Sequence, residues 1–114
     1  MPNQKSVDIG YTLFYNKKGM KEIRFNQDKN TKLKLIRGIG FDEVSKIIKK
    51  NKILKVIDNP NKKKYQNQKL LLIQIKKSIF VVPFVEEKNY IFLKTIYPSH
   101  KYTKKYFIKL KIKK

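Results

Sequence analysis

Four strand-like segments joined by short polar connections constrain the fold of this chain more than any other feature. They cover residues 53–57, 70–75, 79–85 and 90–97, and each is rich in Ile, Leu, Val, Phe or Tyr. The turn cluster DNPN follows the first segment, and connections of hairpin length follow the second and third. Because short consecutive connections join antiparallel neighbours, the pattern predicts a four-stranded antiparallel meander.

Proline 83 lies inside the third of these segments. Proline has no N–H to donate to a neighbouring strand, so it is found on edge strands and at bulges. We therefore expect an edge strand or a bulge at Pro83.

Two helical segments precede the strands. In the first, Asn26 is an N-cap candidate and Gly38 follows the last helical residue, Arg37. The second begins near Phe41, where apolar residues recur at helical spacing. Residues 23–25 form a short strand-like stretch before both. The order predicts an α+β fold in which a short N-terminal strand and two helices pack on one face of the four-stranded sheet, with a short C-terminal helix.

A chain of 114 residues supports one domain with one core. Met20 opens the recognisable pattern, so we expect residues 1–19 to be an N-terminal extension and residues 20–114 to be the domain. Alternatively, residues 11–15 form a short strand that a turn at residues 17–19 follows. The chain has no cysteine, which excludes a disulfide framework and thiolate metal sites. It contains no run of 18 apolar residues and no signal peptide, so we expect a cytoplasmic protein without a membrane segment.

The net charge is the strongest compositional signal. Lysine and arginine outnumber aspartate and glutamate by 29 − 8 = +21, and residues 88–114 contain nine lysines and no acid. Such a field attracts polyanions, nucleic acid and the ribosome first among them, then an acidic protein or an anionic membrane surface. An AT-rich coding sequence would also enrich lysine over arginine, which explains the lysines but not the scarcity of acids.

The segment at residues 93–106, LKTIYPSHKYTKKY, carries the main candidate site. Pro98 ends the last strand, and Ser99 is a good N-cap for a helix. On that helix one face carries cations and the chain's only histidine, and the opposite face carries Tyr102, Thr103 and Tyr106. The cationic face consists of His100, Lys101, Lys104 and Lys105. It predicts a phosphate site or, alternatively, a solvated lysine face.

Metal catalysis is poorly supplied, because the acids are scattered and there is one histidine. No P-loop, nucleophile motif or dinucleotide fingerprint is present, so no cofactor is expected. RNA cleavage needs neither a metal nor a cofactor, since the 2′-OH of the RNA is the nucleophile and the protein supplies a base, an acid and cations. Side chains that could fill these roles are Arg37, Lys94, His100, Lys101, Lys104 and Lys105. Aromatic rings could stack on the bases, or they could be only core and surface residues; the candidates are Tyr65, Tyr97 and Tyr102.

Three stretches together resemble the BrnT-like toxins of type II toxin–antitoxin systems. RFNQDKN followed by RGIGFDEV is similar to the opening of that family, and LKTIYPSHKYTKKY is similar to its closing motif. The turn DNPNKKKYQNQ and the strand pair ending VPFVE resemble one branch of it. The likeness covers roughly residues 21–106. It implies a RelE-like α+β fold and a metal-independent endoribonuclease that blocks translation.

The resemblance also implies partners and a site. RNA is the substrate, an antitoxin from the same operon is the protein partner, and DNA is met only through the antitoxin complex. The implied catalytic residues are Arg37, Lys94, His100 and Lys101, and the implied RNA contacts are Lys104, Lys105, Tyr65 and Tyr102. This chain has Arg37 where the family often has histidine, and an arginine at that position could also be only a capping cation. A non-catalytic RNA-binding or ribosome-associated module, or an interaction protein for an acidic partner, would satisfy the charge as well.

Overall fold

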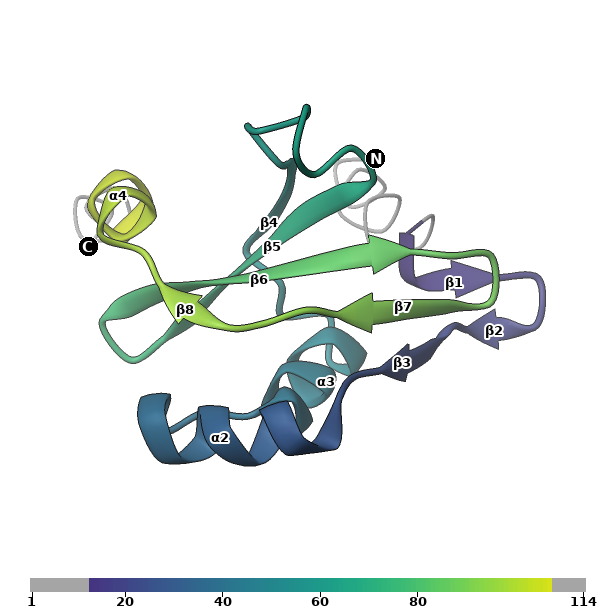
Figure 1. The fold of residues 1–114 in the computed structure, drawn as a ribbon, viewed down its shortest axis with the longest axis horizontal. Helices are drawn as coiled ribbons and strands as arrows, with labels where there is room; N and C mark the ends of the chain where they lie inside the picture. The colour runs from purple at the N-terminus through teal and green to yellow at the C-terminus, as the bar shows by residue number, and fades with distance from the viewer. Residues whose placement is uncertain (1–12, 108–114) are drawn as a thin grey trace.

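The structure, a computed structural model, describes residues 13–107 (Figure 1). Its elements in chain order are β1 (Tyr15–Asn16), β2 (Gly19–Met20), β3 (Glu22–Arg24), α2 (Gln27–Arg37), α3 (Phe41–Lys49), β4 (Lys55–Asp58), β5 (Gln68–Ile75), β6 (Ser78–Glu86), β7 (Tyr90–Leu93), β8 (Tyr97–Pro98), α4 (His100–Tyr102) and the π-helical turn η1 (Thr103–Phe107). The α+β class expected from the sequence is confirmed.

The main sheet differs from the expected four-stranded antiparallel meander. Strands β4, β5, β6 and β7 are antiparallel neighbours, but β3 adds to the outer edge of β7 in parallel, with Ile23 opposite Ile91. The segment expected as one last strand divides into β7 and β8, and both pair with β6. Within residues 13–107 the result is a mixed sheet of six strands in the order β3-β7-β6-β5-β4, with β8 beside β6.

Pro83 lies in β6, a central strand and not an edge strand, but the expected bulge is present opposite it. Between the pairs Phe84–Leu93 and Val81–Tyr97, β6 has two residues and the partner segment has three. The Pro83 carbonyl accepts a hydrogen bond from Lys94 N at 2.8 Å, on the side of β6 that faces β7 and β8. In an antiparallel strand the N and the C=O of one residue point to the same neighbour. The missing N–H of Pro83 therefore faces Lys94, the first residue of the bulge, where the ladder between β6 and β7 ends.

The helices cover both faces of the sheet, whereas the sequence led us to expect them on one. Below the sheet in Figure 1, α2 and α3 bury Leu33, Phe41 and Val44 against alternate residues of the central strands. Above it, α4 and η1 place Tyr102 and Tyr106 over Leu70, Leu72, Ile79 and Val81. Because β5 and β6 are covered on both sides, they are almost continuously apolar, as strands buried on both faces are.

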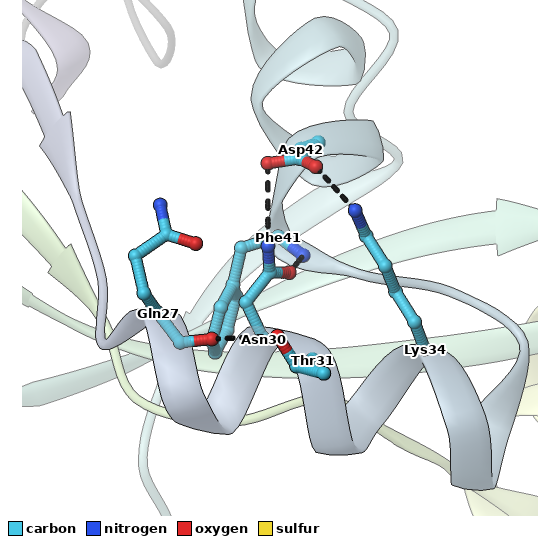
Figure 2. Close-up of polar contacts among 6 residues, drawn as sticks. All are labelled: Gln27, Asn30, Thr31, Lys34, Phe41 and Asp42. Carbon is cyan, nitrogen blue, oxygen red and sulfur yellow. Dashed lines mark hydrogen bonds and ion pairs between the residues drawn. The ribbon is translucent and has the colours of Figure 1, made fainter.

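Side chains of α2 hold the start of α3 (Figure 2). Asn26 caps α2 through a hydrogen bond from Lys29 N, and Gly38 closes it with φ 73°. Gly40, the N-cap residue of α3, has no side chain; the buried Asn30 instead accepts from Phe41 N through Oδ1 at 2.7 Å. A Cβ on Gly40 would lie 2.5 Å from that oxygen. The stretches RFNQDKN and RGIGFDEV are thus joined by direct contact.

Part of the expected N-terminal extension belongs to the core. Phe14 is 1% exposed and its ring lies 5.6 Å from that of Phe84, centroid to centroid. Lys21 N donates to Phe14 O at 2.7 Å, and β1 pairs with β2 across the boundary placed at Met20. The sequence offered a short strand at residues 11–15 and a turn at residues 17–19 as one alternative, but two-residue strands leave no periodicity that would favour it over an extension. Residues 1–12 of the expected extension lie outside the described residues.

Candidate nucleic-acid interface

The segment after β8 folds as the sequence predicts. Ser99 accepts a hydrogen bond from Tyr102 N at 3.1 Å, which caps the short helix α4. Thr103 Oγ1 accepts from Ile79 N at 2.8 Å and fixes the segment to β6. Tyr102 and Tyr106 stack with their centroids 6.2 Å apart against the sheet. His100, Lys101, Lys104 and Lys105 are exposed on the other side, so the two predicted faces are confirmed.

A groove of about 430 Å³ opens on this face of the sheet. Leu70 and Pro83 contribute its apolar part, and Tyr65, Tyr97 and Tyr102 contribute aromatic rings. The polar lining comes from two ends: Lys94, Thr95, Ser99 and Lys101 at the β7, β8 and α4 side, and Asn59 and Gln68 at the loop between β4 and β5. Aromatic faces beside lysines are the combination used to bind single-stranded nucleic acid.

The three tyrosines share one space. Burial raises the pKa of the Tyr97 phenol above its usual value of 10.0, and Tyr102 and Tyr65 raise it further. Tyr97 nevertheless keeps 36% of its surface exposed, so its ring is accessible from the groove. Lys101 Nζ lies 5.4 Å from the centroid of the Tyr102 ring, which places a cation beside an aromatic face. A phenol with a raised pKa stays neutral and can donate a hydrogen bond at physiological pH.

The loop that carries Tyr65 is ordered by its own hydrogen bonds. Asn61 Oδ1 accepts from Lys64 N at 3.2 Å, and Asn61 O accepts from Tyr65 N at 2.9 Å. Asn59 Oδ1 in turn accepts from Asn61 N at 2.9 Å. These contacts hold the Tyr65 side of the groove in one conformation, which lowers the entropic cost of binding.

Acidic side chains are kept away from the groove, since none of its lining residues is acidic. Several are paired elsewhere: Glu22 with Arg24, Asp42 with Lys34, Asp58 with Lys62 and Lys69, and Glu86 with Lys21. The Lys34 ammonium holds the pKa of Asp42 below its usual value, and Lys69 does the same for Asp58. Lys94 and Lys101 face the groove without such a neutralising partner among residues 13–107.

Half of the predicted site residues meet in this groove, namely Tyr65, Lys94, Lys101 and Tyr102. His100 lies between the lining residues Ser99 and Lys101, but its side chain is not part of the lining. Lys104 and Lys105 lie further along the exposed side of η1. Arg37 ends α2 on the opposite side of the sheet, so the structure does not bring it together with His100 (Figure 1).

The sequence analysis did not assign four polar residues to the groove. They are Asn59, Gln68, Thr95 and Ser99. Asn59 read as a turn residue and Ser99 as a cap, and both do have those roles. Gln68 carries no local signal, because its place in the groove depends on the pairing of β4 with β5.

Residues 13–107 contain no group of three or more His, Cys, Asp or Glu side chains placed to hold a metal ion. No helix in this range is long and apolar enough to cross a membrane. Comparisons with protein-family models, curated proteins and solved structures find no match for the chain.

Proposed function

We propose that this protein is a metal-independent endoribonuclease of the toxin class, which binds single-stranded RNA in the groove beside α4. The observation that carries the proposal is the gathering of Lys94 and Lys101 with three tyrosines in one acid-free groove. The resemblance to BrnT-like toxins, with their RelE-like fold, adds the biological role, which is arrest of translation until an antitoxin binds.

Single-stranded RNA fits this groove better than a duplex does. Tyrosine faces bind bases that have left the stack, and those of an intact duplex are not available. Two lysines at one end of the groove suit a phosphate. The net charge of +21 also speeds the encounter of the protein with RNA of any sequence. We therefore propose that RNA bases stack on the tyrosines and that RNA phosphates bind the lysines. The tyrosines are Tyr65, Tyr97 and Tyr102, and the lysines are Lys94 and Lys101.

The cleavage step uses the RNA's own 2′-OH. A base takes the proton from the 2′-oxygen, which forms a bond to the adjacent phosphorus while the bond from phosphorus to the 5′-oxygen breaks. The products are a 2′,3′-cyclic phosphate and a 5′-OH, whose proton comes from an acid. We assign charge stabilisation to Lys94 and Lys101 and the role of base to His100, which lies in the chain between the lining residues Ser99 and Lys101. We assign the role of acid to Tyr97, because its phenol lines the groove and keeps its proton at neutral pH.

Cleavage of single-stranded RNA in EDTA, followed under single-turnover conditions, tests the proposal. Replacing Lys94 and Lys101 together by glutamine should lower the cleavage rate by about 10²-fold or more, because charge stabilisation of this kind is worth about that much. The matched control replaces Lys29 and Lys32, which are exposed on α2 across the sheet, and removes the same charge. Its rate should stay within about threefold of the parent.

Salt dependence of binding separates site contacts from general attraction. Each lysine on a phosphate contributes about −0.7 to the slope of log K against log salt for a single strand. The groove pair should therefore flatten the slope by about 1.4, and the α2 pair should leave it unchanged. Binding without cleavage by the parent protein would instead support the non-catalytic RNA-binding module. Equal losses in both variants would refute the groove as the RNA site.

A protein partner has a separate candidate surface on α2. Leu35 is 83% exposed and Ile36 72% exposed, and they lie on the outer side of the helix among the cations Lys29 and Lys32. Exposed apolar anchors with a basic border suit an acidic partner, and we assign this surface to the antitoxin. The variant Leu35→Glu with Ile36→Glu should still arrest growth but escape rescue by the co-expressed antitoxin. Full rescue would place the antitoxin elsewhere.

A further inference from the structure

We infer that the groove is a pocket for a single extruded nucleotide, and that the Gln68 amide selects keto bases, guanine and uracil, over amino bases. This inference rests on the proposed function and adds to it a preference of the RNA site. It depends on how hydrogen bonds fix the two amides at the loop end of the groove.

The Asn59 amide is oriented by two contacts. Its Oδ1 accepts from Asn61 N at 2.9 Å, and its Nδ2 donates to Gln68 Oε1 at 3.3 Å. The backbone pairs the same two residues, since Asn59 N donates to Gln68 O at 3.3 Å. Exchanging the amide ends of Asn59 would break both side-chain contacts. Its orientation therefore sets that of Gln68, because Oε1 is occupied by a donor.

Gln68 then presents its amide nitrogen as the end without a partner among the described residues, because its Oε1 already accepts from Asn59. Its Nε2 donates to no acceptor within residues 13–107, and an amide nitrogen carries two N–H groups. Gln68 and the tyrosines line the same groove, so a base that enters it comes beside this amide. Guanine and uracil present carbonyl oxygens to such a donor, whereas adenine and cytosine present an exocyclic amine at the corresponding edge. Donor facing donor is unfavourable, so keto bases should bind better.

The charges around the groove determine where the phosphate and the base of the nucleotide bind. Lys94 and Lys101 occupy the β7, β8 and α4 side. Beyond Gln68, the adjoining hollow is lined by three acids and two lysines, so it offers phosphate no excess of positive charge; they are Asp58, Glu86, Glu87, Lys62 and Lys69. The phosphate should therefore lie at the lysine end and the base at the amide end. The groove's volume of about 430 Å³ is within the range of small-molecule pockets and admits one nucleotide.

Binding of small probes to the full chain tests this without requiring cleavage. The probes are the 5′-monophosphates of guanosine, uridine, adenosine and cytidine, with ribose 5-phosphate as the probe lacking a base. Stacking on tyrosine should make nucleotides bind roughly 5- to 150-fold more tightly than ribose 5-phosphate. The two keto nucleotides should bind about 2- to 10-fold more tightly than the two amino nucleotides, the effect of one net hydrogen bond.

Gln68→Glu is the decisive variant. A carboxylate keeps the acceptor for Asn59 Nδ2 but replaces the donor by a second acceptor, so the preference should vanish or reverse toward adenosine and cytidine. Gln74→Glu is the matched control, since Gln74 lies on the same strand, is exposed and does not line the groove. It carries the same charge change and should keep the keto preference.

The outcomes separate this inference from the proposed function. Nucleotide binding without a keto preference, or an unchanged preference in Gln68→Glu, overturns the inference and leaves the RNA site standing. Equal weakening of all probes by both glutamate variants also overturns it, because only general charge is then involved. If neither nucleotides nor single-stranded RNA bind, the proposed function fails and this inference fails with it.

Discussion

Phe14→Ala tests whether the N-terminal hairpin belongs to the domain. The ring is 1% exposed and packs against Phe84, so its removal loses both burial and ring contact and leaves a cavity. Truncation of a buried phenylalanine costs about 3–5 kcal/mol. A domain of this size is stable by about 5–15 kcal/mol, so the variant should lose a large share of its stability.

Urea unfolding measures the effect directly. With a slope of about 2 kcal/mol per molar urea, a loss of about 4 kcal/mol lowers the midpoint by about 2 M. Leu35→Ala is the matched control, since it truncates an apolar side chain that is 83% exposed. Its midpoint should move by no more than about 0.3 M, which corresponds to about 0.5 kcal/mol at that slope.

A chain beginning at Met20 extends the same test. It lacks Phe14 and the partner strand of β2, so it should be at least as unstable as Phe14→Ala. If both keep the parent midpoint, the hairpin is not part of the folded core, and the boundary expected from sequence at residue 20 is right.

Three further predictions follow from single contacts. Asn30→Ala leaves the buried Phe41 N–H without its acceptor, so it should cost about 1–3 kcal/mol in urea unfolding, and an unchanged midpoint would argue against the cap. Lys34→Met should raise the pKa of Asp42 toward 3.8, as an NMR titration would show. In the parent protein this carboxyl stabilises the fold above pH 3.8, and the contribution is lost as the pH falls through the lowered pKa of Asp42. The raised pKa of Tyr97 contributes stability that is complete below pH 10.0 and lost as pH rises through the folded-state pKa. The difference between the spectrophotometric titration curves of the parent and of Tyr97→Phe should show the Tyr97 phenol ionising above pH 10.0. Ionisation at or below pH 10.0 would refute the burial argument.

Local signals in the sequence predicted the helices and the helix ends. Asn26 caps α2, Gly38 closes it, and Ser99 caps α4, because each of these depends on hydrogen bonds within a few residues. Helical spacing in the same way placed Phe41 and Val44 of α3 in the core. The opposite placement of tyrosines and cations after Ser99 was also predicted, since the period of a helix fixes which side chains share a face.

Pairing between distant segments could not be derived in the same way. The parallel contact of β3 with β7 joins residues 22–24 to residues 90–92, and no local pattern encodes that choice. It changed the sheet from antiparallel to mixed. The bulge beside Pro83 was expected from its sequence, but the central position of its strand is a property of the assembled sheet.

The candidate site shows the same division. Residue type marked Lys94, Lys101 and the tyrosines as possible RNA contacts, because cations and aromatic rings are what such a site needs. Only the tertiary structure brought Tyr65 from the loop after β4 to the side of α4, added Gln68, and left Arg37 across the sheet. The physical reason is that charge and ring chemistry belong to single residues, whereas a groove exists only where strands and helices distant in sequence pack together.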